Sequence, residues 1–153
     1  MSFLPMSRDV ICVSPDDSLI DSKKLMDDWQ IRHLPVVVGR RVVGIISDRD
    51  ILLRSSLRQN GKIGVENIRV QSVMTPNPVM CNESESLINI SMLMADKKIS
   101  SVLVVDKKRH ILGIITSSDI IDQFCKQQNR PSPALSDKFN FRDDEMFGIG
   151  LLE

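Results

Sequence analysis

The chain contains the octet Gly44-Ile45-Ile46-Ser47-Asp48-Arg49-Asp50-Ile51 and repeats its pattern at Gly113-Ile114-Ile115-Thr116-Ser117-Ser118-Asp119-Ile120. The glycine, the hydroxyl residue, the acid and the apolar residues keep the same spacing in both octets. The similarity extends outward on both sides, and one extra residue in the second copy falls near Arg109. This self-similarity indicates an internal duplication with copies over about residues 10–53 and 79–123.

The composition limits the partners of the protein. Its 153 residues hold 20 lysines and arginines and 20 aspartates and glutamates, so no net charge favours nucleic acid or a membrane surface. Any anion site must therefore be local. Residues 1–9 lack the apolar run of a signal peptide, and no segment approaches the roughly 20 apolar residues of a membrane span. We expect a soluble, cytoplasmic protein that binds neither nucleic acid nor membranes.

The reactive side chains predict neither a metal site nor an enzyme. Cys12, Cys81 and Cys125 are odd in number and lack C-x-x-C spacing, which is typical of reduced thiols. The two histidines, His33 and His110, have no neighbouring ligands at metal-binding spacing. No serine or cysteine is flanked by a base and an orienting acid, so we expect no catalytic residues.

Each copy has the pattern strand, helix, strand, strand, helix. The apolar runs at residues 10–13 and 79–81 predict the first strands. Capping-type residues follow each run and predict a helix, carrying Leu19, Leu25 and Met26 in the first copy and Leu87, Ile90 and Met94 in the second. Apolar runs at residues 36–38 and 42–46, and at 102–105 and 111–115, predict two hairpins. A final helix should begin at each octet hydroxyl.

Several other residues are expected to serve packing. The methionines at helical positions, Met26, Met92 and Met94, are predicted to fill the core. Trp29 is expected to close the first helix against the core or against another subunit.

The octets suit phosphate chemistry. A strand that runs into a helix at Ser47 or Thr116 presents free N–H groups and a positive dipole end, and the hydroxyl adds a donor. One turn further on, Asp50 or Asp119 can accept both hydroxyls of a ribose. The same spacing is also that of a capping box, in which hydroxyl and acid only satisfy the helix start. A binding site and a purely structural cap are therefore both open.

The glycines at the octet starts have two explanations. Gly44 and Gly113 would allow either a ligand or a facing backbone to approach closely.

The sequence resembles a pair of CBS domains, the tandem regulatory unit often called a Bateman module, over about residues 6–125. The marks of the resemblance are the two octets together with Ser14-Pro15-Asp16-Asp17-Ser18, Arg32-His33-Leu34-Pro35-Val36 and Met74-Thr75-Pro76-Asn77-Pro78-Val79. The resemblance implies an α/β (α+β) fold of two β-α-β-β-α units that pack sheet to sheet about a pseudo-twofold axis. It also implies two clefts for adenosine ligands such as AMP, ADP, ATP, NAD or S-adenosylmethionine.

The expected ligand-binding residues combine the octets with the family positions. They are Arg32, His33, Pro35, Gly44, Ser47, Asp50, Val79, Gly113, Thr116 and Asp119. The resemblance places Arg32 against a phosphate, and apolar residues near 10–13 and 79–81 would enclose the adenine.

The two clefts are not expected to be equivalent. The second copy has Ser100 at the position of Arg32, so we expect the cleft containing Asp50 to bind more tightly than the one containing Asp119. Charge for the weaker cleft would have to come from the turn of residues 107–109.

The expected organisation is a first unit at residues 6–56, a linker at 57–73, a second unit at 74–126 and a tail at 127–153. The tail carries several aromatic residues and is expected to dock on its own module or on a neighbouring subunit. We expect a regulatory adenosine-nucleotide-binding module that senses cellular energy state, forms a homodimer through its helices and acts on an unknown regulated protein. The alternative is a ligand-free dimerisation or scaffold module with the same fold.

Overall fold

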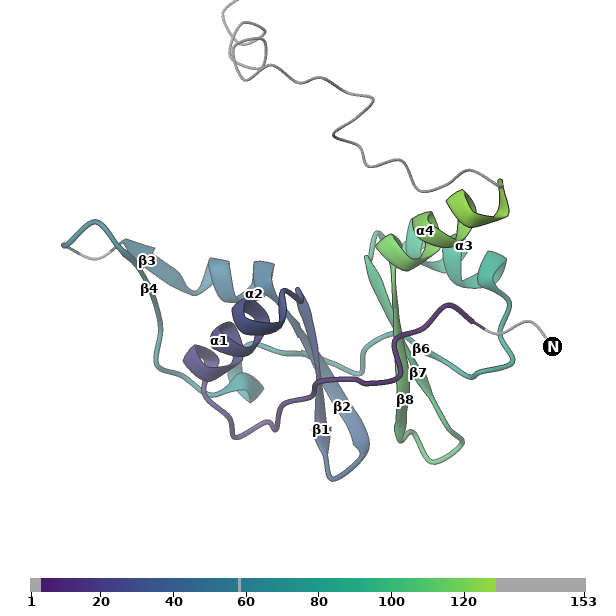
Figure 1. Cartoon of the computed structure of the whole chain (residues 1–153). Coiled ribbons are helices and arrows are strands. Elements are labelled where there is room, and N and C mark those ends of the chain that lie inside the picture. The colour runs from purple at the N-terminus through teal and green to yellow at the C-terminus, as the bar shows by residue number, and fades with distance from the viewer. Residues whose placement is uncertain (1–3, 58, 129–153) are drawn as a thin grey trace, which may run out of the picture.

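The computed structural model describes residues 4–57 and 59–128. The first unit contains α1 (Leu19–Trp29), β1 (His33–Val38), β2 (Arg41–Ser47) and α2 (Asp48–Leu53). The second contains β6 (Met80–Cys81), α3 (Leu87–Lys97), β7 (Ser101–Val105), β8 (Ile111–Thr116) and α4 (Ser117–Gln127). Figure 1 shows the two units side by side, with the helices at one end of the molecule and the tips of both hairpins at the other.

Matching local signals begin and end the first helix of each unit. A serine hydroxyl caps each N-terminus by accepting a backbone N–H three residues on, Ser18 for α1 and Ser86 for α3. Each helix ends at a residue with left-handed backbone, Gln30 with φ 51° and Lys98 with φ 53°. The predicted helices are therefore confirmed, and the duplication holds even at their caps.

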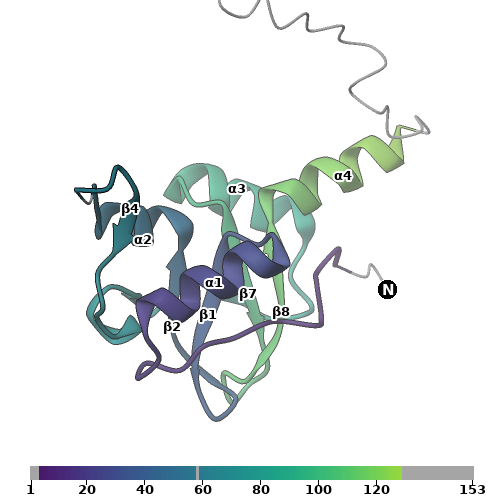
Figure 2. The same ribbon diagram turned by 60° about the vertical axis from the view of Figure 1, so that its left-hand side comes forward.

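The segment at the start of each unit pairs with the other unit. The short strand β5 (Thr75–Pro76) begins the second unit but pairs with β2 of the first, where Gly44 faces Pro76. Ser7 lies near the start of the first unit but forms a bridge with Ile114 in β8 of the second. Figure 2 shows the N-terminal segment passing across β8 before it reaches α1. The sheet of each unit is thus extended by a segment from the other unit of the same chain.

Three apolar clusters hold the fold together. Each unit has its own core between sheet and helices, around Ile46 in the first and Ile115 in the second. A third cluster lies between the sheets, where Val42 of β2 meets Leu103 and Val105 of β7. Fully burying one such side chain contributes about 1.5–3 kcal/mol, so this interface fixes the two units against each other. The predicted α+β fold with sheet-to-sheet packing is confirmed.

One strand prediction needs correction. Residues 10–13 do not form a ladder, because only Val13 bridges to a neighbouring strand. The region of the predicted linker, residues 57–73, also contains secondary structure: β3 (Ser55–Leu57) pairs with β4 (Ile63–Val65), and a short 3-10 helix, η1 (Val70–Ser72), follows. Gly61 supports the turn of this extra hairpin with φ 76°.

One packing prediction was wrong, because Met92 is 67% exposed and does not fill the core. Trp29 is 63% exposed, which excludes closure against the core and leaves contact with another subunit as the prediction. Both lie on the outer faces of their helices, whereas Met26 and Met94 point inward and are buried as predicted. The predicted tail lies almost wholly beyond residue 128, outside the described residues. In the described part of the chain, every helix is too short or too polar to cross a membrane.

Candidate functional site

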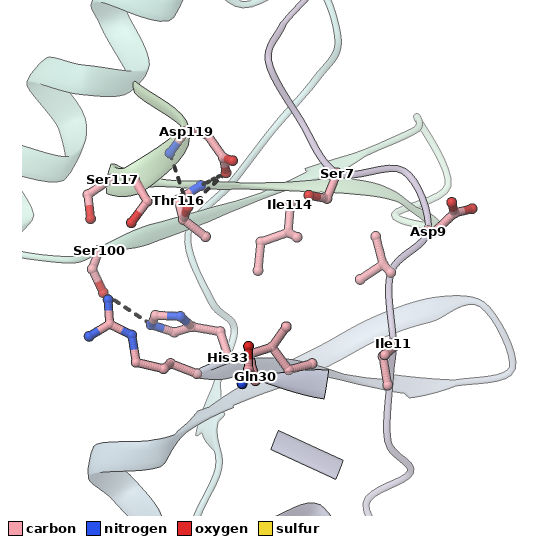
Figure 3. A pocket seen from close by; sticks show the side chains of 14 residues that line it. Ser7, Asp9, Ile11, Gln30, His33, Ser100, Ile114, Thr116, Ser117 and Asp119 are labelled. Atoms are coloured by element: carbon pink, nitrogen blue, oxygen red, sulfur yellow. Dashed lines mark hydrogen bonds between the residues drawn. The ribbon is translucent and has the colours of Figure 1, made fainter. Parts of the chain in front are cut away.

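A cavity of about 310 Å³ lies between the two units. Its lining comes from four segments: the N-terminal segment, the α1–β1 junction, Ser100 at the α3–β7 junction, and the β8–α4 junction. Figure 3 shows Ser7, Ile114, Thr116 and Asp119 on one side of this space, with Gln30 and His33 facing them. The cavity therefore exists only because both units are present.

The start of α4 forms one wall. The Thr116 hydroxyl accepts a hydrogen bond from the Asp119 N–H at 3.3 Å. Oδ2 of Asp119 in turn accepts from the Thr116 N–H at 2.7 Å and from its hydroxyl at 2.8 Å (Figure 3). This is a complete capping box, and Oδ1 of Asp119 accepts no hydrogen bond from the described residues. One carboxylate oxygen thus holds the helix start while the other is available to a ligand.

The same helix end offers a backbone donor. The N–H of Ser117 donates to the Ser100 carbonyl at 3.0 Å. The N–H of Ser118 has no partner within the described ranges, and both serines line the cavity. Because α4 is 11 residues long, its positive dipole end adds to this donor. The wall suits a phosphate or another anionic group.

Arg32 and His33 face this wall from the first unit. Arg32 supplies the one cationic side chain of the cavity lining. The Nε2 atom of His33 lies 3.1 Å from the Ser100 hydroxyl, across the boundary between the units (Figure 3). Burial lowers the pKa of His33, against the raising effect of Asp48; Arg32 lowers it further and Asp50 raises it. The neutral imidazole is therefore favoured, and the full positive charge comes from Arg32.

Apolar side chains form the rest of the wall. Val10 and Ile11 of the N-terminal segment lie in the lining together with Ile31 and Ile114. Asp9 adds a carboxylate at the same segment. The cavity thus combines an apolar surface, one cation and two acids, which suits a small molecule with a flat apolar part and limited negative charge.

The corresponding position in the first unit differs. Oδ2 of Asp50 accepts from the N–H and hydroxyl of Ser47, both at 2.8 Å, so the capping box is repeated. The neighbouring Asp48, however, accepts from the Arg49 N–H at 2.8 Å through its own carboxylate. The Asp48 carboxylate therefore accepts from the Arg49 N–H, which corresponds to the Ser118 N–H of α4.

The predicted pairing of Arg32 with Asp50 in one cleft stays a prediction, because Arg32 also lines a second cavity beside Asp48, at the start of α2. Arg32 lines the cavity that contains Asp119, and neither Ser47 nor Asp50 lines it. The Arg32 side of this cavity belongs to the first unit and the octet side to the second, so the cavity joins the α1–β1 junction of one copy to the octet of the other. The expectation of tighter binding at Asp50 stays a prediction.

The octet glycines allow a facing segment of backbone to pack closely, and they do not line this cavity. A Cβ atom on Gly113 would lie 2.5 Å from Met6 Sδ and 3.0 Å from the Ser7 carbonyl oxygen. On Gly44 it would lie 2.6 Å from Met74 Sδ and 3.0 Å from the carbonyl oxygen of residue 75. Of the two explanations for these glycines, close contact with a facing backbone is the one observed.

Other predicted site residues lie elsewhere. The carbonyl of the buried Pro35 accepts from the Val13 N–H at 3.0 Å, and that of Val79 accepts from the Leu103 N–H at 3.2 Å. Both thus serve strand contacts, and neither lines the cavity. The cationic turn at residues 107–109 is at the tip of the second hairpin, also away from the lining.

Some lining residues were missed by sequence reasoning. Ser7 and Asp9 lie at the start of the first unit, before its predicted first strand, and Ser117 and Ser118 vary between the octets. The available signal was the match of residues 6–7 with residues 74–75, which implied equivalent roles for the two preceding segments.

Thiol or metal chemistry would require a reactive cysteine or a cluster of metal ligands. All three cysteines are free, and burial raises the pKa of Cys12. Burial, with a smaller contribution from Glu85, raises the pKa of Cys81 to about 11. Such thiols are protonated and weakly nucleophilic. Within the described residues, no cluster of three or more histidine, cysteine or acidic side chains could hold a metal ion.

These features define a paired α+β module that builds a ligand-sized cavity from both of its units. The CBS domain profile matches residues 2–56 and 70–126, so the chain belongs to the CBS domain family. The crystal structure of the CBS domain pair of protein MJ0100 in complex with 5′-methylthioadenosine and S-adenosyl-L-methionine is similar, with 30% identity and a TM-score of 0.71. The similarity covers 83% of this chain and 98% of that one.

Curated relatives contain such pairs in different contexts. A CBS domain-containing protein of Dictyostelium discoideum is 30% identical over 79% of this chain and 88% of its own length. Inosine-5′-monophosphate dehydrogenase of Korarchaeum cryptofilum is 34% identical over 74% of this chain, which spans only 22% of the dehydrogenase. The pair thus forms nearly the whole of one relative and a small part of an enzyme in another.

Proposed function

We propose that the chain is a regulatory module that binds an adenosine nucleotide in the cavity between Arg32 and Asp119. The observation that carries this proposal is the composition of that cavity, which unites a cation, a helix N-terminus and apolar walls from both units. A ligand there contacts both units at once. It can therefore favour one relative arrangement of the units over another, which is the differential interaction that a switch requires.

Each part of the ligand has a partner. Its phosphate lies between the Arg32 guanidinium and the free Ser118 N–H, and its ribose hydroxyls donate to Oδ1 of Asp119. The adenine packs on the apolar residues Ile11 and Ile114. The related MJ0100 pair, whose structure is a complex with two adenosine compounds, supports this choice of ligand class.

Size and charge favour AMP within that class. The volume of about 310 Å³ is at the lower end of the range for small-molecule sites, about 300–1,000 Å³, which disfavours the dinucleotide NAD. The lining has a single cation, Arg32, against the carboxylates of Asp9 and Asp119, which disfavours the additional phosphates of ADP and ATP. We therefore rank AMP first, and infer that the module senses cytoplasmic energy state through it.

The functional unit is proposed to be a homodimer. The outer faces of the helices carry large exposed apolar side chains: Ile20, Trp29, Leu52, Leu53, Ile88, Met92, Ile121 and Phe124. Large exposed apolar side chains are typical of protein interaction sites where they form one patch. A second copy would cover it, and ligand-driven changes in the angle between units would alter this interface or the surface presented to a regulated protein.

The alternative is a ligand-free dimerisation or scaffold module. It is supported by the two complete capping boxes, because Ser47–Asp50 and Thr116–Asp119 bond the N–H groups of these four residues without any ligand. In this alternative the octets are structural only.

Thermal unfolding of the nucleotide-free protein separates the two functions. AMP at about 100 times its dissociation constant should add about 2.7 kcal/mol and raise Tm by about 5 to 10 °C, with smaller effects of ADP, ATP, NAD and S-adenosylmethionine and none of GMP. The rise should disappear in Asp119→Ala and persist in Asp50→Ala. No rise with any adenosine compound would leave only the scaffold function.

A further inference from the structure

The two hairpins meet at their tips, far along the strands from the cavity. The N–H of Val42 donates to the Arg109 carbonyl, and the N–H of Ile111 donates to the Arg40 carbonyl, both at 3.0 Å. Arg41 and His110 form a bridge between the same turns. Figures 1 and 2 both show the two tips together at the end of the molecule opposite to the helices. The turns therefore form one continuous surface, here called the hairpin surface.

The hairpin surface is strongly cationic. It carries five cationic residues: Arg40, Arg41, Lys107, Lys108 and Arg109. Residues 33–47 and 101–116 contain one acid, Asp106, which already accepts hydrogen bonds from the Lys108 N–H and from the backbone and ring of His110. None of the five cations forms an ion pair with a described residue. On a chain with no net charge, this concentration of positive charge favours the approach of an anion.

The best matching anion is in the chain itself. Residues 143–145 are Asp143, Asp144 and Glu145, three consecutive acids in the tail. We infer that this acidic segment docks on the hairpin surface of the same chain. Carboxylates match the planar guanidinium of arginine through paired hydrogen bonds, and three of them would offset much of the positive charge at the tips.

The length of the tail is sufficient for this contact. The path from the hairpin surface to the end of α4 follows β8, six residues or about 20 Å, and then α4, 11 residues or about 17 Å. The separation therefore cannot exceed about 37 Å. Asp143 follows Gln127 by 16 residues, which can reach about 50 Å.

An acidic peptide fits the surface better than nucleic acid. Residues 33–47 and 101–116 contain no phenylalanine, tyrosine or tryptophan, so the hairpins provide no platform on which bases could stack. A contact through charge alone is the kind that a short acidic segment makes.

The test compares full-length wild type with the variant Asp143→Asn, Asp144→Asn, Glu145→Gln by two-dimensional ¹⁵N NMR. Backbone amides of residues 38–42 and 106–110 should change in chemical shift, and 0.5 M NaCl should move the wild-type amides in the same direction. The matched control Asp137→Asn, Glu153→Gln neutralises tail acids outside the segment and should leave those amides in place. Tripolyphosphate should bind the hairpin amides about tenfold more tightly in the triple variant, because the competing carboxylates are gone.

The reciprocal variant tests the same contact from the other side. Arg40→Glu with Arg41→Glu should abolish the effect of the tail substitutions on residues 106–110. The inference is overturned if the triple variant leaves the hairpin amides unmoved, or if their shifts depend on protein concentration, which would indicate docking on a second copy. Equal affinity of wild type and triple variant for a ten-nucleotide oligothymidylate at these amides would also overturn it in favour of a nucleic-acid surface.

Discussion

The two octets share one backbone design but differ in chemistry. Both place a hydroxyl and an acid in a capping box, with the acid accepting from the hydroxyl at 2.8 Å in each copy. Between these residues the first octet has Asp48-Arg49 and the second Ser117-Ser118. Asp48 occupies the N–H of Arg49, whereas the N–H of Ser118 stays without a partner among the described residues.

This difference distinguishes the octet residues that are needed for folding from those that could bind a ligand. The residues that the copies share are the ones that end a strand and begin a helix, so they report how the unit folds. The residues that differ decide whether the helix start can receive an anion. Both copies keep the fold, and the proposed function assigns binding to the copy whose octet faces Arg32.

The largest expected effect comes from removing that cation. Arg32→Ser installs the residue that the second copy has at the equivalent position, Ser100. Loss of a charge-assisted contact with the phosphate should weaken AMP binding about 10- to 100-fold in calorimetric titration, with little change in unfolding temperature.

The matched control is Arg49→Ser, which removes an exposed arginine from the start of α2 instead. It should leave AMP affinity within about twofold of wild type. Equal losses in the two variants would mean that general charge, rather than the cavity at Asp119, governs binding.

The sequence predicted the units well because their signals are local. Capping residues and apolar spacing act within one helix, so the starts of α1, α2, α3 and α4 followed directly. The pairing of Arg32 with Asp119 could not be predicted in the same way, because it depends on which unit each segment packs against. The extra hairpin of β3 and β4 was missed because its strands are only three residues long.

The second-largest expected effect concerns the segments at Ser7 and β5, each of which pairs with the other unit. Gly113→Ala would place a methyl group 3.0 Å from the Ser7 carbonyl and displace a segment that lines the cavity, whereas Gly44→Ala would displace β5, which does not line it. Each substitution should cost about 1–3 kcal/mol of stability in urea unfolding. Only Gly113→Ala should also weaken AMP binding, and equal weakening by both would contradict the assignment of the cavity.

A smaller effect tests the shared capping boxes. Asp50→Ala and Asp119→Ala each remove an acid that accepts two hydrogen bonds at the helix start. Without ligand, both should lower the free energy of unfolding by about 1 kcal/mol. With saturating AMP the variants should diverge, because Asp119→Ala also loses the ribose contact. Parallel behaviour with and without AMP would show that both acids are only caps.

The smallest expected effect is a pH dependence of the free energy of unfolding that arises from the first copy alone. His33 lies at the boundary between the units, and the second copy has Ser101 at its position, which does not titrate. Burial and Arg32 lower the pKa of His33 despite the opposing fields of Asp48 and Asp50. The unfolded chain then binds the proton more readily than the folded one, so stability is complete above the unfolded pKa near 6.5 and falls as the pH drops through the folded value. In urea unfolding between pH 7.5 and 5, His33→Gln should lose less stability than wild type. An identical decline in both proteins would assign the acid sensitivity to other groups and leave the two copies equivalent in this respect.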